Sequence, residues 1–137
     1  MSNNKIHLKI TTPLGIFYEG DISELIAPGV EGYFGVQYGH TPFLTAIKPG
    51  VLSVYIDKTL QKYVIHDGFV VVAPSTVHIL TETIERPEDI NKERAEKAKQ
   101  QAEMLLREKK EGTDFRQAEY SLYKAIARLE ILENNPS

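Results

Sequence analysis

The stretch Glu85-Arg86-Pro87-Glu88-Asp89 divides the sequence into two parts of different character. Residues 1–84 hold eight of the nine glycines but only 12 of the 35 charged residues (16 basic, 19 acidic), whereas residues 85–137 hold the other 23 charges and one glycine. Short apolar runs separated by glycines are typical of strands and turns, and densely charged segments with few glycines are typical of exposed helices. The sequence therefore predicts two domains, residues 1–86 and residues 87–137.

The composition is that of a globular protein without disulfides. The 137 residues are 42% hydrophobic, carry a formal net charge of −3 and include no cysteine. Disulfides, thiolate zinc sites and a cysteine nucleophile are therefore excluded, and the charge gives no reason to expect a nucleic-acid partner. The longest apolar run, residues 69–73, is far shorter than the roughly 18 residues that span a bilayer. Residues 1–10 lack the apolar core of a signal peptide, so we expect no direct insertion into a membrane.

The first domain is predicted to be an antiparallel β-sandwich. Apolar and polar residues alternate over residues 6–11, which places one apolar face on a strand. Further short apolar runs follow, separated by Pro-Gly, Asp-Lys, Asp-Gly and Pro-Ser pairs, and they cover residues 22–27, 51–56, 63–66, 69–73 and 77–81. Strands at this spacing, without helical patterns between them, indicate a sandwich or barrel. Residues 70–72 are apolar on both faces, so we expect that strand to be covered on both sides.

The second domain is predicted to be an antiparallel two-helix hairpin, which makes the fold class α+β. The first helix should begin near Asp89 and stop at Gly112, and Thr113 or Asp114 should cap the second helix. The second helix repeats apolar residues in alternating steps of three and four, at Phe115, Ala118, Leu122, Ala125, Leu129 and Leu132. Docking of this helix is expected to bury chiefly its large members, Phe115, Leu122, Leu129 and Leu132.

Several motifs resemble one known family. The longest runs through Glu31-Gly32-Tyr33-Phe34-Gly35-Val36 and then from Gly39-His40-Thr41-Pro42 to Leu52. It resembles the signature of the epsilon subunit of bacterial F-type ATP synthase. Residues 67–70 and 76–81 resemble later strands of that family's sandwich, and residues 89–95 resemble the start of its first carboxy-terminal helix. The resemblance covers nearly the whole chain in order, and its first motif is long and specific.

The resemblance implies a mechanical function without catalysis by the chain itself. In that family the sandwich packs on the gamma stalk and on the polar loops of the c-ring. The helices either fold against the sandwich or rise toward the catalytic alpha and beta subunits and inhibit ATP hydrolysis. We therefore expect a central-stalk subunit of the proton-translocating ATP synthase, peripheral at the cytoplasmic face of the cell membrane. Rotor contacts are expected at Glu31, Gly32, Tyr33 and His40, and inhibitory helix contacts at Arg116, Lys124 and Arg128.

Some bacterial members of the family bind ATP without hydrolysing it, at a helix-opening I/L-D-x-x-R-A motif and further arginines. The corresponding residues here would be Glu85, Ile90, Asn91, Arg94, Ala95, Lys124 and Arg128. Asn91 replaces the aspartate, and Gln101 and Lys124 stand where those members carry arginine. One lost charge-assisted hydrogen bond weakens binding about tenfold or more. The resemblance therefore implies no required cofactor and only a weakened site for regulatory ATP.

Two other classes of function stay open from the sequence. The strict repeat of the second helix also suits a coiled coil between chains, so a free-standing β-sandwich binding module with a helical oligomerisation tail is one alternative. An enzyme of unrecognised type is the other, against which the lack of a nucleophile-and-base set speaks. The histidines at positions 7, 40, 66 and 78 lack metal-ligand spacing. His40 is interpreted as a turn histidine bonded to nearby backbone, or as an interface residue.

Overall fold

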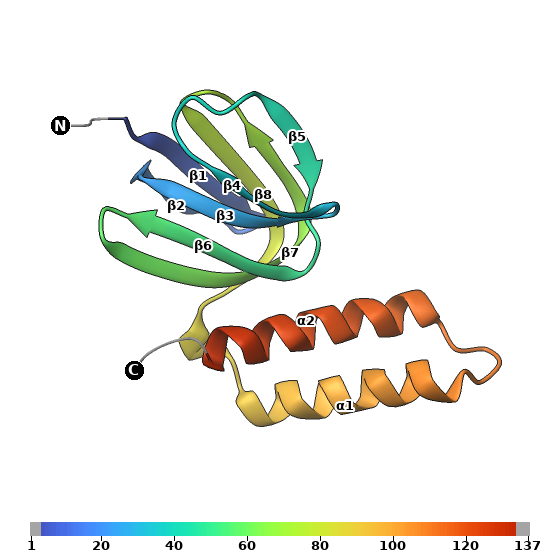
Figure 1. The fold of residues 1–137 in the computed structure, drawn as a ribbon. Coiled ribbons are helices and arrows are strands. Elements are labelled where there is room, and N and C mark those ends of the chain that lie inside the picture. Colours follow the sequence, from blue (N-terminus) through green and yellow to red (C-terminus); the bar gives the residue numbers. More distant parts are fainter. Residues whose placement is uncertain (1–3, 134–137) are drawn as a thin grey trace.

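A computed structural model describes residues 4–133 and shows a β-sandwich followed by two antiparallel helices (Figure 1). The strands are β1 (Ile6–Thr12), β2 (Gly15–Ile22), β3 (Glu24–Gly29), β4 (Gly32–Val36), β5 (Phe43–Ala46), β6 (Gly50–Ile56), β7 (Thr59–Val72) and β8 (Thr76–Glu85). A 3-10 turn (Pro87–Asp89) leads to α1 (Lys92–Glu108) and α2 (Phe115–Glu133). The α+β fold class is confirmed. Residues 1–3 and 134–137, at the ends of the two predicted domains, lie outside the described residues.

The strands form one continuous sheet that folds over so that its halves face each other (Figure 1). The strand order is β2-β1-β8-β7-β6-β3-β4, and β5 pairs with β7 beside this path. Every pair is antiparallel except β1 with β8, which run parallel. The predicted antiparallel sandwich is thus confirmed apart from one pair. These two strands are the first and last of the domain, so no tight hairpin imposes an antiparallel arrangement on them.

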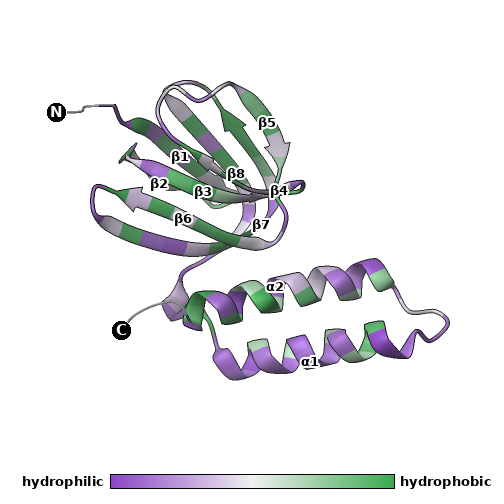
Figure 2. Cartoon of the chain, viewed as in Figure 1, coloured by the Kyte–Doolittle hydropathy of each residue, from purple (hydrophilic) through white to green (hydrophobic). Residues whose placement is uncertain are grey.

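The core of the sandwich follows from the alternation that the sequence shows in its first strand. Ile6, Leu8 and Ile10 are completely buried, and their side chains join one cluster that reaches through the strands to Ile79 of β8. The strands alternate in hydropathy, whereas α1 is hydrophilic along most of its length (Figure 2). The sandwich therefore builds its main core from its own residues.

Strand β7 continues through Asp67-Gly68, where the sequence predicts a turn between two strands. Its first part pairs with β6, its second part pairs with β5, and β8 pairs with both. Asp67 has a positive φ of 65°, and a Cβ added to Gly68 would lie 1.8 Å from the carbonyl oxygen of Leu80. The Asp-Gly pair therefore marks a bend at which one strand passes between the halves of the sheet.

The bounds of α1 differ from the prediction. The helix begins at Lys92, with Asn91 as its N-cap, because the Oδ1 atom of Asn91 accepts a hydrogen bond from the backbone N–H of Arg94 at 3.0 Å. Asp89, the predicted cap, belongs to the preceding 3-10 turn instead. The helix ends at Glu108, with Lys109 in the left-handed conformation, before Gly112 is reached. These corrections shorten α1 at both ends.

The predicted start of α2 is confirmed. The Oδ1 atom of Asp114 accepts a hydrogen bond from the backbone N–H of Gln117 at 3.0 Å, as an N-cap requires. None of the helices in residues 4–133 combines the length and the hydropathy that a membrane span needs.

Helix α2 is apolar on two opposite sides. Figure 1 shows it between the sandwich and α1. Ala118, from the predicted stripe, is buried beside residues of α1, and the buried Ala125 lies seven residues later on the same side of the helix. Ala127 and Ile131 are buried on the side of the sandwich. Ala125 and Ala127 are two residues apart, which is about 200° around a helix axis. The stripe that would suit a coiled coil between chains thus packs within this chain.

Of the four predicted docking residues of α2, Leu132 is confirmed and the other three are wrong. Val51 of β6 and Val64 of β7 receive Ala127 and Ile131, and the partly buried Leu132 adds to this contact. Among the other large stripe residues, Phe115 is exposed and Leu122 and Leu129 are only partly buried. The 3-4 periodicity identifies the side of the helix that faces α1, whereas the docking side carries a less regular series.

Candidate functional site

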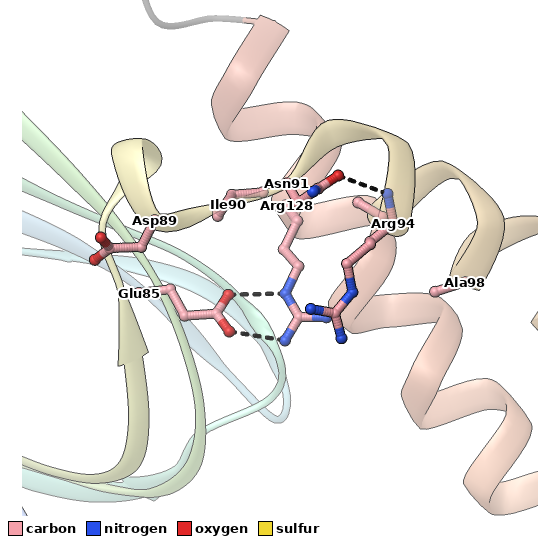
Figure 3. A pocket seen from close by; sticks show the side chains of 8 residues that line it. Glu85, Asp89, Ile90, Asn91, Arg94, Ala98 and Arg128 are labelled. Carbon is pink, nitrogen blue, oxygen red and sulfur yellow. Dashed lines mark hydrogen bonds and ion pairs between the residues drawn. The ribbon is translucent and has the colours of Figure 1, made fainter.

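A pocket of about 220 Å³ lies where the sandwich passes into the helices. Its walls come from the end of β8, the 3-10 turn and both helices, and Figure 3 shows most of the lining side chains. The lining residues are Glu85, Asp89, Ile90, Asn91, Arg94, Ala95, Ala98 and Arg128. Six of the seven residues predicted from the ATP motif therefore meet in one place. Lys124 is the exception, and Asp89 and Ala98 are additions that the motif does not include.

An ion pair closes one side of the pocket. Nε and Nη2 of Arg128 donate hydrogen bonds to Oε1 and Oε2 of Glu85, both at 2.8 Å (Figure 3). Both side chains are partly buried, and the two parallel bonds make this a bidentate contact of the strong kind. The pair ties α2 to the last residue of β8. Glu85 and Arg128 thus bind each other when the helices lie against the sandwich.

Arg94 is the second cation of the pocket. Its side chain extends from α1 so that its guanidinium group lies beside that of Arg128 (Figure 3). Two neighbouring guanidinium groups attract an anion, but Glu85 already neutralises Arg128. The pocket is also smaller than the 300–1,000 Å³ or so that is usual for sites of drug-sized ligands. A nucleotide would therefore have to compete with Glu85 and widen the pocket.

The predicted inhibitory cations lie in three different surroundings. Arg128 is held by Glu85, and Lys124 lies one turn earlier on α2, with Nζ 5.0 Å from the centre of the Tyr120 ring. Arg116, near the start of α2, is exposed and borders a crevice beside Pro49 of the sandwich. Arg116 and Lys124 therefore have no ion pair to break within the described residues, whereas Arg128 does.

The structure brings three of the four predicted rotor residues together. Glu31 and Gly32 are exposed in the turn between β3 and β4, and Tyr33 follows as the second residue of β4. The hydroxyl of Tyr33 accepts a hydrogen bond from the backbone N–H of Val51 at 2.9 Å. Burial raises the pKa of Tyr33. Tyr33 thus has one structural contact, while more than half of its surface remains exposed.

His40 lies beyond the opposite end of β4. The backbone N–H of Gly39 donates a hydrogen bond to the carbonyl oxygen of Pro74, which places His40 beside the turn between β7 and β8. Its Nδ1 atom lies 2.8 Å from the carbonyl oxygen of Thr41, and its ring lies 5.3 Å from that of Phe43. The interpretation as a turn histidine bonded to nearby backbone is confirmed. The four predicted rotor residues therefore form two separate surfaces.

An apolar outer face of the sheet is the feature that sequence reasoning missed. Four neighbouring side chains there are between 41% and 64% exposed, namely Leu44, Phe69, Val71 and Leu80. Leu44 pairs with Val71, and Phe69 pairs with Leu80, so the four are contiguous across β5, β7 and β8. The expectation that residues 70–72 are covered on both sides is wrong within the chain, since no described element covers Val71. The continuous apolar run over residues 70–72 was nevertheless the sequence feature that indicated an apolar outer face.

The outer face has the composition of an interaction surface. Val71 also pairs with His78, which in turn lies opposite Lys9 of β1, so polar and charged residues adjoin the apolar centre. Exposed apolar patches with a polar rim mark sites of protein association. Among residues 4–133, no three His, Asp or Glu side chains are grouped as a metal site requires.

Residues 5–87 match the family described as ATP synthase, Delta/Epsilon chain, beta-sandwich domain, and residues 88–133 match the ATP synthase, Delta/Epsilon chain, long alpha-helix domain. The chain belongs to this delta/epsilon chain family of ATP synthase. The ATP synthase epsilon chain of Halalkalibacterium halodurans is 38% identical over 127 residues, which cover 92% of this chain and 96% of that one. The epsilon chain of Moorella thermoacetica is 36% identical, covering 90% and 93%. The resemblance seen in the sequence is thereby confirmed.

Two solved assemblies contain chains of the same fold. One belongs to the mitochondrial ATP synthase of Euglena gracilis, with a TM-score of 0.83, 24% identity and coverage of 98% of this chain and 84% of that one. The other belongs to the central stalk and c-ring of the Tetrahymena thermophila mitochondrial ATP synthase, with a TM-score of 0.62, 14% identity and complete coverage of both chains. Family membership makes the chain a subunit of an ATP synthase and decides against both alternatives that the sequence left open.

Proposed function

We propose that the chain couples the gamma stalk to the c-ring in the rotor of a proton-translocating F-type ATP synthase, and that its helices inhibit ATP hydrolysis. The uncovered apolar face of β5, β7 and β8 is the observation that carries this proposal. Family membership supports it, because relatives are epsilon chains and one chain of the same fold belongs to a central stalk and c-ring assembly. The complex lies at the cytoplasmic face of the cell membrane, and the chain is peripheral there.

The gamma subunit is the proposed partner of the apolar face. Burial contributes about 1.5–3 kcal/mol for each large apolar side chain, so covering four half-exposed ones contributes roughly 3–6 kcal/mol. The charged and polar rim, which includes Lys9 and His78, would fix the orientation of the partner. The polar loops of the c-ring are proposed to contact the exposed turn at Glu31 and Gly32 together with Tyr33. His40 is proposed as a separate rotor contact.

Replacing Phe69 by lysine is expected to weaken binding to a purified gamma and c-ring subcomplex about tenfold or more. The substitution places a charge in the centre of the apolar face, where a partner would have to desolvate it. Leu60→Lys is the matched control, because Leu60 is also an exposed apolar residue of the sandwich but lies away from this face. Both variants should melt like the parent. Equal binding by Phe69→Lys and the parent would show that the face is not the docking surface.

The helices are proposed to inhibit hydrolysis by leaving the sandwich and reaching the catalytic alpha and beta subunits. Their attachment is small. It consists mainly of the apolar contact of Ala127, Ile131 and Leu132, the Arg128–Glu85 pair, and the contact of Tyr120 with β7. A contact of this size leaves a gap of only a few kcal/mol for a partner to overcome. Arg116, Lys124 and Arg128 are the proposed inhibitory contacts. Release of α2 frees Arg128 from Glu85, so the full set of cations becomes available only in the raised form.

A weak regulatory nucleotide site is the second candidate function, and the pocket between β8 and the helices favours it. Asn91→Asp is expected to bind ATP about five- to tenfold more tightly than the parent, because a carboxylate accepts stronger hydrogen bonds than an amide. Aspartate caps a helix as well as asparagine does, so α1 should be unchanged. Isothermal titration calorimetry provides the measurement.

Two further variants control this experiment. Asn91→Ser keeps a capping side chain but adds no charge, so ATP affinity should not rise. Lys124→Arg should also leave the affinity unchanged, because Lys124 does not line the pocket. If Asn91→Asp binds ATP no better than Asn91→Ser, the pocket is not a nucleotide site.

A further inference from the structure

A buried imidazole lies in the contact between the sandwich and α2. His66 of β7 is 7% exposed and packs edge-to-face against Tyr120 of α2, with ring centres 6.0 Å apart. Its Nδ1 atom lies 3.3 Å from the hydroxyl of Tyr120. Its Nε2 atom is buried and has no hydrogen-bond partner among the described residues. Buried polar atoms without partners are rare and costly in folded proteins, so the imidazole has an unfavourable environment in the structure with the helix docked.

Tyr120 also connects α2 to the bend of β7. Its hydroxyl donates a hydrogen bond to Oδ1 of Asp67, the residue with the positive φ at the bend. The other oxygen of Asp67, Oδ2, lies 3.6 Å from Nδ1 of His66. Burial, followed by this hydrogen bond, raises the pKa of Tyr120, so its hydroxyl remains a donor. Two side chains of the sandwich and one of the helical hairpin therefore share one polar contact.

The charged groups around His66 act in opposite directions. Burial is the main reason that the pKa of His66 is lowered, and the charge of Lys124 on α2 lowers it further. Asp67 on β7 and Glu85 on β8 act in the raising direction. Both influences of α2, the covering ring of Tyr120 and the charge of Lys124, disappear when the helix leaves. Both carboxylates stay with the sandwich, so His66 accepts a proton more readily once the hairpin is released.

We propose that His66, Asp67 and Tyr120 form a proton-sensitive latch that holds the helical hairpin on the sandwich while His66 is neutral and releases it when His66 is protonated. The proposal rests on the proposed function in that the released hairpin is the inhibitory form. It adds a trigger, because a lower pH in the compartment that contains the chain would then favour inhibition of ATP hydrolysis.

Thermodynamic linkage between protonation of His66 and docking of the hairpin fixes the direction and the size of the pH effect on docking. The released state binds the proton more tightly, so docking is at full strength above the ordinary histidine pKa of about 6.5 and is lost as the pH falls through the lowered pKa of the docked state. A single proton changes the docking constant at most about tenfold per pH unit.

The absence of cysteine allows a direct measurement of docking in the full-length chain. Ala127→Cys introduces a thiol on the side of α2 that faces the sandwich. This thiol is buried while the helix is docked and reacts with a methanethiosulfonate reagent only during release. A cysteine introduced as Gln100→Cys on the exposed side of α1 reports the intrinsic reaction rate at each pH. The ratio of the two rates is a protection factor. It should be constant above about pH 7 and fall up to about tenfold per unit below pH 6.5.

Two histidine variants in this background test the assignment. His66→Gln should remove the pH dependence, because glutamine has no proton to gain in this range. His40→Gln, which changes a partly buried turn histidine away from α2, should retain it. A protection factor that does not change with pH in the parent, or that still falls in His66→Gln, would overturn the latch.

An NMR titration keeps the proposal testable if His66→Gln does not fold. The ring protons of His66 should titrate below the ordinary range in the parent and near it in Tyr120→Ala, which lacks the covering ring. Identical titration in both proteins would also overturn the latch. These measurements use the isolated chain, whereas failure of the proposed function would appear as an unchanged hydrolysis rate in the assembled ATP synthase. The two failures are therefore distinguishable.

Discussion

Replacing Gly68 by alanine is expected to unfold the sandwich. A Cβ at this position would lie 1.8 Å from the carbonyl oxygen of Leu80 and 2.9 Å from the Cα of Thr81, and all of these are backbone atoms that no rotamer change can move. The bend of β7 would have to straighten or separate from β8. Since β7 pairs with β5, β6 and β8, we expect a loss of more than about 4 kcal/mol in the free energy of unfolding.

Urea unfolding followed by circular dichroism measures this loss. Gly35→Ala is the matched control, because it is also a glycine within a strand, but the nearest atom to its added Cβ is 3.8 Å away. That variant should stay within about 1 kcal/mol of the parent. If Gly68→Ala unfolds at the same urea concentration as Gly35→Ala, the bend does not depend on glycine.

Replacing Ile131 by alanine is expected to release the hairpin. Ile131 is 1% exposed and fills the contact with Val51 and Val64. Truncating a buried isoleucine costs about 2–5 kcal/mol, which is comparable to the whole gap expected for docking. Amide exchange in α1 and α2 should accelerate while exchange in the sandwich core stays slow. In an ATP synthase reconstituted with this variant, hydrolysis should be inhibited more strongly than with the parent chain.

Ile126→Ala provides the comparison on the same helix. Ile126 is 40% exposed and lies outside the docking contact, so its truncation should cost less than about 1 kcal/mol and leave both readouts unchanged. Faster exchange in both variants would point to fraying of α2 rather than to release from the sandwich. Unchanged hydrolysis with Ile131→Ala, despite accelerated exchange, would separate docking from inhibition.

The strands that sequence reasoning found are those with apolar alternation or continuous apolar runs. Ile6–Thr12 and Thr76–Glu85 were predicted for this reason, apart from their ends. Three strands were not among the predicted runs, namely β2, β4 and β5. β2 and β4 each contain two glycines and bury only their last residue, so they lack the apolar run that marks a strand. Pairing with neighbouring strands overrides their weak local preference.

The pocket residues were expected from the resemblance to the family, and most of them lie close together in the sequence. Ile90, Arg94 and Ala95 come from one helix start, and Glu85 precedes them by a few residues. Arg128 and Lys124 both lie on α2, but of the two Arg128 alone lines the pocket, and this difference depends on how α2 is rotated against the sandwich. That rotation is set by the second apolar side of the helix, which carries Ala127 and Ile131. Two small or widely spaced residues give no periodic signal strong enough to compete with the regular stripe.

The placement of α2 between α1 and the sandwich has a consequence for the order in which the protein forms. The docking contact and the ion pair to Glu85 both belong to α2, while α1 packs chiefly on α2 within the described residues. During synthesis the sandwich can close as soon as β8 leaves the ribosome, because β8 completes its main core. α1 then emerges with its buried alanines still lacking a partner. The fold is therefore completed only when α2 forms. Before that point, the nascent chain consists of a folded sandwich followed by an α1 segment that is not yet packed.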